Sequence, residues 1–173
     1  MGAEAQRPQV ATAEAREPSV PPIAGRVWAF ADGLAAADIL PARFRALDPV
    51  AARSVLFADI DASLAGRLAV GDVLVAGHGL GAGEGAAAAA RALAAAGFVA
   101  VLAASYASGF DEALLAAGVP AFAVDAPAAF RTGDRLRVNV EAGTVANHSS
   151  GDRQPLRGLD ERARERLRAL FGR

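Results

Sequence analysis

His78 and Glu84 are two titratable side chains, six positions apart, in a glycine-rich stretch of this chain. A histidine titrates near neutral pH, and a neighbouring carboxylate completes a pair that can remove and return protons. Because glycines separate the two, the backbone is free to bring both side chains over one cavity. The pair therefore predicts acid–base chemistry, which Asp38 and Asp111 could extend with further carboxylates. The alternative is that His78 is an ordinary polar loop residue.

The same stretch also predicts an anion-binding loop. An apolar run over Val73–Ala76 is typical of a buried strand, and the strong helix formers of Ala86–Ala96 follow the glycines. A strand, a glycine loop and a helix together present free backbone N–H groups and the positive end of a helix dipole. Glu84 lies at that helix end, where its negative charge would repel a carboxylate substrate. The alternative is that Glu84 is an ordinary residue of the first helical turn. The glycines expected to bind substrate are Gly81, Gly83 and Gly85.

Composition narrows the class of protein. The 173 residues suit one domain, and 18 Lys and Arg against 19 Asp and Glu form no concentrated basic patch, so nucleic acid is not an expected partner. Without cysteine, and with only 2 His, a metal site of the chain's own is not expected. No run of about 18 strongly apolar residues predicts a membrane span. The N-terminus lacks the apolar core of a signal peptide, so we expect a cytoplasmic location.

The elements that must position the loop predict an α/β fold. Residues 1–24, rich in Ala, Glu, Arg and Pro, are expected to be a disordered leader, and residues 25–173 one domain ending in an amphipathic helix. The segment 31–43 is expected to be a loop. The other expected elements are strands at 25–30, 98–105 and 119–124, a helix starting after Asp48, a turn at 63–68, a helix at 111–117, a hairpin at 136–146 and a helix at 160–171.

Short motifs follow one another in an order typical of a known family. They are Gly25–Phe30, Ile39–Arg43, Gly71–Gly77, Ser105–Ala107, Phe110 and Gly118–Pro120. In this order and spacing the chain resembles the small subunit of 3-isopropylmalate dehydratase, the swivel domain of the aconitase superfamily. The resemblance implies a swivelling β/β/α domain, a mixed sheet with flanking helices, that docks on a larger subunit. It also implies a [4Fe–4S] cluster on that partner and no cofactor bound by this chain.

The family's loop carries a Ser-Ser-Arg run, in which a serine moves the substrate proton and the arginine binds a carboxylate. This chain has Glu84-Gly85-Ala86 at those positions, so neither group is present. Of the family's D-N-I-D-T-D motif, Asp32 remains in register and Asp38 lies one position late. The resemblance makes both candidate substrate-binding residues beside a degenerate active site.

Three functions stay open at this point. In the first case the chain is a small-subunit-like partner of an aconitase-type large subunit and is not competent for the usual dehydration by itself. Alternatively, it is a repurposed stand-alone enzyme that performs cofactor-free dehydration, isomerisation or cyclisation with His78 and Glu84. In the third case the chain is a true dehydratase subunit, and its partner supplies everything that the chain lacks. The expected ligand is a small organic acid or a related molecule. The expected partner is a large subunit, approached through the alanine face of Ala86–Ala96, or a second copy of the chain.

Overall fold

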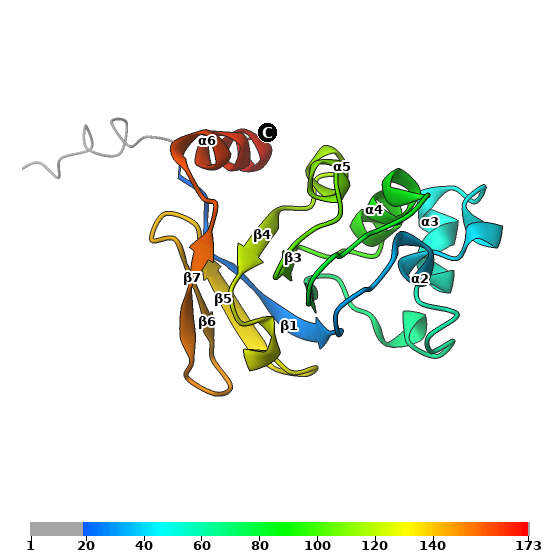
Figure 1. Cartoon of the computed structure of the whole chain (residues 1–173), viewed down its shortest axis with the longest axis horizontal. Helices are drawn as coiled ribbons and strands as arrows, with labels where there is room; N and C mark the ends of the chain where they lie inside the picture. Colours follow the sequence, from blue (N-terminus) through cyan, green and yellow to red (C-terminus); the bar gives the residue numbers. More distant parts are fainter. Residues whose placement is uncertain (1–18, 173) are drawn as a thin grey trace, which may run out of the picture.

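Seven β-strands close into a barrel in the computed structural model, which describes residues 19–172. Around the barrel the strand order is β1-β2-β3-β4-β7-β6-β5. The strands are β1 (Ile23–Ala29), β2 (Val73–Ala76), β3 (Ala100–Ala103), β4 (Ala121–Val124), β5 (Arg135–Asn139), β6 (Thr144–Asn147) and β7 (Arg153–Arg157). The α-helices are α2 (Ala36–Ile39), α3 (Pro49–Ala52), α4 (Ala86–Ala95), α5 (Phe110–Ala116) and α6 (Glu161–Phe171). Figure 1 shows α2, α3, α4 and α5 gathered on one side of the barrel, with α6 apart from them. The α/β class is as predicted, but the mixed sheet is closed.

The parallel half of the barrel, β1 to β4, separates two apolar cores. Every residue of β2 and β3 is buried, as expected for strands covered on both faces. Successive residues of β2 belong to different apolar clusters. Val73 and Val75 belong to the cluster inside the barrel, whereas Leu74 belongs to the cluster under the helices. The alternation of a strand thus ties helix packing to barrel packing.

The antiparallel half of the barrel has one solvent-exposed face. In β5 the residues alternate between exposed and buried, which confirms the predicted hairpin with β6. β7 was not predicted, and it joins β6 to β4 and so closes the barrel. Within its sequence, RQPLR, only Leu156 is buried, so no apolar run or clear alternation marks the strand.

Local corrections concern the first third of the domain. β1 begins at Ile23, two residues before the expected start of order, and Val20 is already buried. Residues 1–18 of the expected leader lie outside the described residues. The 31–43 segment was predicted to be a loop, yet it contains α2. Asp38 Oδ2 accepts a hydrogen bond from the Ala35 N–H at 2.9 Å and closes the first turn of that helix.

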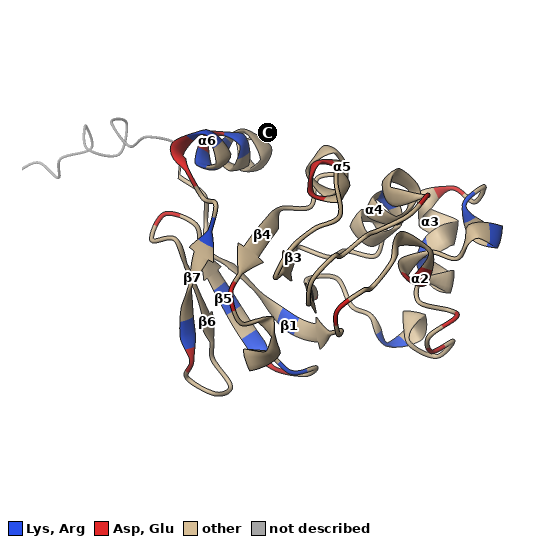
Figure 2. Ribbon diagram, viewed as in Figure 1, with Lys and Arg blue, Asp and Glu red and all other residues tan. Residues whose placement is uncertain are grey.

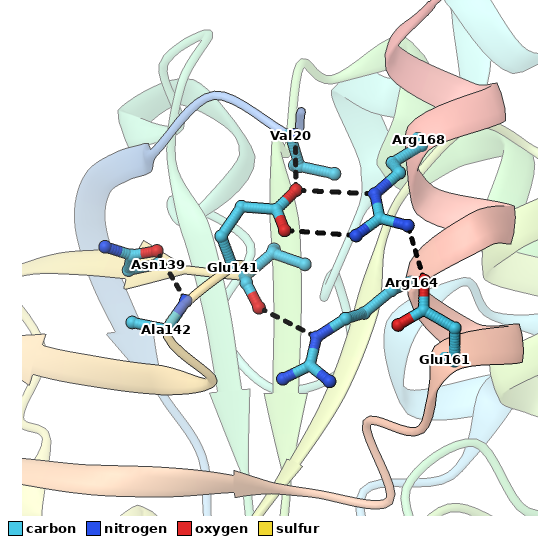
Figure 3. Close-up of polar contacts among 8 residues, drawn as sticks. Val20, Asn139, Glu141, Ala142, Glu161, Arg164 and Arg168 are labelled. Atoms are coloured by element: carbon cyan, nitrogen blue, oxygen red, sulfur yellow. Dashed lines mark hydrogen bonds and ion pairs between the residues drawn. The ribbon is translucent and has the colours of Figure 1, made fainter. Parts of the chain in front are cut away.

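The C-terminal helix α6 packs across the open end of the barrel interior. Asp160 caps it as predicted, accepting from the Ala163 N–H at 2.8 Å, and Leu167 is buried. Figure 3 shows how polar contacts hold it: Arg168 Nη2 pairs with Glu141 Oε2 at 3.2 Å, and Glu141 Oε1 also accepts the Val20 N–H. None of the helices between residues 19 and 172 combines the length and apolar character needed to cross a bilayer.

Candidate active site

The glycine-rich loop joins β2 to α4 and is fixed by backbone hydrogen bonds on both sides. On one side the Gly81 N–H donates to Leu34 O at 2.8 Å. On the other, Leu80 pairs with Tyr106 in a parallel bridge, with Leu80 N–H donating to Ser105 O at 3.1 Å. The loop thus lies between the segment that follows β1 and the segment that follows β3. These are the carboxyl ends of neighbouring parallel strands, where α/β folds place their ligands.

Asp32 holds the start of the loop. Its Oδ1 accepts a hydrogen bond from the His78 backbone N–H at 2.7 Å, and the Gly33 N–H donates back to His78 O at 2.9 Å. A Cβ at Gly77 would collide with the Asp32 carboxylate, so this close approach requires glycine. Asp32, predicted as a substrate ligand, therefore has one carboxylate oxygen occupied by the loop backbone. Asp38 is similarly engaged at the first turn of α2.

The imidazole of His78 meets a hydroxyl that the sequence analysis did not single out. His78 Nδ1 lies 3.2 Å from Ser105 Oγ, and the same Oγ accepts the Gly79 N–H at 2.9 Å. Because the Gly79 N–H donates to Ser105 Oγ, the serine hydroxyl can donate in turn to His78 Nδ1 when that nitrogen carries no proton. A hydroxyl beside an imidazole is an arrangement that serves proton transfer or nucleophilic chemistry.

Glu84 takes a different direction from His78. Its side chain is 94% exposed, and its nearest cation is Arg45, whose Nη1 lies 3.7 Å from Glu84 Oε2. Within residues 19–172 no hydrogen bond or ion pair joins Glu84 to His78. The structure therefore gives each group its own partner, and the catalytic pairing of the two stays a prediction.

Arg45 is a further site residue that the sequence analysis missed. Its Nη2 donates to the Glu84 carbonyl at 3.0 Å, and its side chain packs where a Cβ of Gly85 would lie. Its Nε is buried and has no hydrogen-bond partner among the described residues. The residue lies on the turn after the short 3₁₀ helix Ala42–Phe44, so a guanidinium reaches the start of α4 from a distant part of the chain.

The three candidate glycines differ in what they do. Gly81 has φ +85° and is buried against the Phe110 ring, which leaves no room for a Cβ. Gly83 has φ +88° but is exposed, with nothing near the position of a Cβ. Gly85 caps α4, whose first N–H groups lack intrahelical partners. Gly81 is thus a packing residue, while Gly83 and Gly85 lie where backbone N–H groups can meet an anion. Among the described residues, no three His, Asp or Glu side chains converge as metal ligands would.

Known proteins resemble this chain in sequence. The chain is 32% identical over 136 residues to the 3-isopropylmalate dehydratase small subunit of Moorella thermoacetica, covering 78% of this chain and 82% of the relative. It is 34% identical over 142 residues to that of Pyrobaculum neutrophilum, covering 79% and 87%. The chain belongs to the 3-isopropylmalate dehydratase small-subunit family. No protein-family model matches it.

A solved member of the 3-isopropylmalate dehydratase family has the same fold. The crystal structure of 3-isopropylmalate dehydratase from Methanocaldococcus jannaschii superimposes with a TM-score of 0.74 at 25% identity, over 79% of this chain and 81% of that one. The family resemblance drawn from short motifs is therefore confirmed over most of the domain. Residues 84–88, Glu-Gly-Ala-Ala-Ala, carry only one functional side chain at the start of α4.

Proposed function

We propose that this chain is a small-subunit-like swivel domain of an isopropylmalate dehydratase or aconitase-type hydro-lyase, and that by itself it is not competent for the usual dehydration. One observation carries the proposal: the loop scaffold is intact while the chemistry at its end is missing. Asp32 holds the loop through His78, yet residues 85–88 supply no hydroxyl and no guanidinium at the start of α4.

The partner in this proposal is a larger aconitase-type subunit, and the ligand is a small organic acid. A [4Fe–4S] cluster bound by that subunit would supply Lewis-acid chemistry at a substrate hydroxyl. The sequence of this chain contains no cysteine, so thiolate ligands for such a cluster must come from the partner. This chain contributes the backbone N–H groups near Gly83 and Gly85, which orient a carboxylate without any side chain. The exposed Glu84 carboxylate weakens that binding by repulsion.

The experiment is co-expression with each large-subunit candidate of the source organism, followed by size-exclusion chromatography and an isopropylmalate dehydration assay. We expect a complex with little activity, and a gain of about tenfold or more from Glu84→Ser/Ala86→Arg, which returns a hydroxyl and a guanidinium to the loop. Gly85 is left in place because Arg45 occupies the space of its Cβ. Glu84→Ser/Ala87→Arg is the matched control, with the guanidinium one position late. A fully active unmodified complex, or no complex with any candidate, would overturn the proposal.

A second candidate function is a stand-alone acid–base enzyme that uses the residues of the same glycine-rich loop. The contact of His78 Nδ1 with Ser105 Oγ at 3.2 Å favours it, because a histidine and a hydroxyl then face one another without any cofactor. His78 is the base and Glu84 the second titratable group of this hypothesis. Loss of about 10²–10⁴-fold in the chain's own activity is expected for His78→Gln. A loss of under about threefold in both His78→Gln and Glu84→Gln would remove the two residues from consideration.

A further inference from the structure

A cavity of about 420 Å³ lies between α5 and α6, away from the glycine-rich loop. Its floor is β4, where the outward-facing Ala121 and Ala123 are small and only partly buried. Figure 1 shows α5 and α6 standing on either side of β4. Because alanine side chains leave the space above the strand open, the cavity follows directly from the sequence of β4.

The two walls of this cavity, which we call the α5–α6 cavity, carry opposite charges. Asp111 and Glu112 come from α5, and Arg162 and Arg166 come from α6. Figure 2 shows acidic residues on α5 and, on α6, basic residues together with acidic ones. Within residues 19–172 none of these four side chains forms an ion pair, so the opposed charges do not neutralise one another.

Other charged residues of the α5–α6 cavity have partners already. Arg157 Nη1 pairs with Asp125 Oδ1 at 2.8 Å, and Asp160 caps α6. The helix α6 is held by two other arginines: Arg168 pairs with Glu141 (Figure 3), and Arg164 donates to the Val140 carbonyl. Those contacts fix α6, so Arg162 and Arg166 are not needed to hold the helix in place.

We propose that the α5–α6 cavity binds a small zwitterion with an apolar side chain, such as an aliphatic amino acid. Its carboxylate would pair with Arg162 and Arg166, and its ammonium group with Asp111 and Glu112. The apolar body would lie against Leu115 and Leu167, which also line the cavity. An anion without a positive charge is attracted by the arginines but repelled by the carboxylates. A cation without a negative charge is attracted by the carboxylates but repelled by the arginines. Only a ligand that carries both charges is attracted by both walls.

The volume suits such a ligand, since small-molecule sites begin at about 300 Å³. The site goes beyond the proposed function, because it uses none of the loop residues and involves no reaction. Tyr106 forms part of the wall, and its hydroxyl donates to Phe122 O at 2.7 Å, which leaves the charged residues to select the ligand.

The test is a titration of the full chain, followed by amide NMR, with a matched set of three compounds. L-norvaline carries both charges, pentanoate only the carboxylate and butylamine only the ammonium group. We expect norvaline to bind with a dissociation constant of about 1 mM, with shifts at Ala123 and Gly158, and each single-charge compound to bind at least about tenfold more weakly. Equal affinity for pentanoate, shifts centred on Gly83, or no saturation by about 50 mM would overturn the proposal.

Variants separate the two walls. Arg166→Gln and Asp111→Asn are each expected to weaken norvaline binding about fivefold or more, because each removes one charged partner. Arg91→Gln is the matched control, since Arg91 is exposed on α4 and does not line the cavity. Unchanged affinity in both wall variants, or the same loss in the control, would contradict the site. Circular dichroism confirms that each variant is folded.

Discussion

Ser105 Oγ lies 3.2 Å from His78 Nδ1 and also accepts the Gly79 N–H, so one hydroxyl fixes both the ring and the backbone of the loop. Ser105→Ala is therefore expected to lower the free energy of unfolding by about 1 kcal/mol. It should also speed hydrogen exchange at the Gly79 amide. Ser54→Ala is a suitable control, because the Ser54 hydroxyl only donates to Ala51 O on an exposed turn. Unchanged exchange at Gly79 would show that the serine does not hold the loop.

Asp72 forms the most deeply buried charged cluster of the described chain. Its carboxylate, 5% exposed, accepts from Trp28 Nε1 at 2.7 Å, from the Ala69 N–H at 2.8 Å and from Arg26 at 3.1 Å. Burial raises the pKa of Asp72, but these hydrogen bonds outweigh it and hold the pKa below its usual value. Asp72→Asn replaces an acceptor by an amide that cannot serve three donors, and should cost about 2–4 kcal/mol in urea denaturation.

The lowered pKa also fixes the pH dependence of that cost. A carboxyl whose pKa is lower in the folded state stabilises the protein at neutral pH, and loses this effect as the pH falls below about 3.9. The difference between wild type and Asp72→Asn should thus be constant from pH 6 to 8 and shrink below about pH 4. Asp125→Asn, in an exposed pair with Arg157, is the control. A difference that grows on acidification would contradict the assignment.

Gly81 and Gly83 allow a matched comparison, since both have positive φ, +85° and +88°. Alanine at either position costs about 1 kcal/mol of backbone strain. At Gly81 the added methyl group would also overlap the Phe110 ring, so Gly81→Ala should cost about 3 kcal/mol or more. Urea denaturation measures both values. Equal costs for the two variants would show that the Phe110 ring moves aside freely.

Arg43 and Arg45, two positions apart in the sequence, make different contacts. Arg45 donates to the Glu84 carbonyl, whereas Arg43 forms an exposed pair with Asp59. Arg45→Gln should raise the rate of amide hydrogen exchange at Gly85 and in the first turn of α4 several-fold, because the loop loses the hydrogen bond from the guanidinium to the Glu84 carbonyl. Arg43→Gln should leave these amides unchanged. The reverse result would place the support of the loop elsewhere.

The apolar pattern of the sequence was enough to predict most elements near the loop. The runs at Val73–Ala76 and Ala100–Ala103 are buried on both faces, and Asp48 caps α3 as its type suggests. The alanine helix ends at Ala95, one residue before the end of the predicted run Ala86–Ala96. Periodicity and capping are local properties, which is why they can be read from neighbouring residues.

The misses arise where distant segments meet. β7 carries one buried residue and Pro155, so only its neighbours β4 and β6 make it a strand. Ser105 meets His78 across 27 residues of sequence, and Arg45 reaches Glu84 across 39. One signal could have found Ser105, since it follows a buried strand parallel to the one before His78. No comparable local pattern marks Arg45.

Closure of the sheet determines how this domain can associate. Each of the seven strands of the described barrel has a neighbour on both sides, so none of them is an edge strand. A barrel without an edge strand offers another chain no complete edge to which it could add a strand. Recognition must therefore depend on side chains and loops. Any partner can dock and leave without disturbing the hydrogen-bond ladder of the barrel.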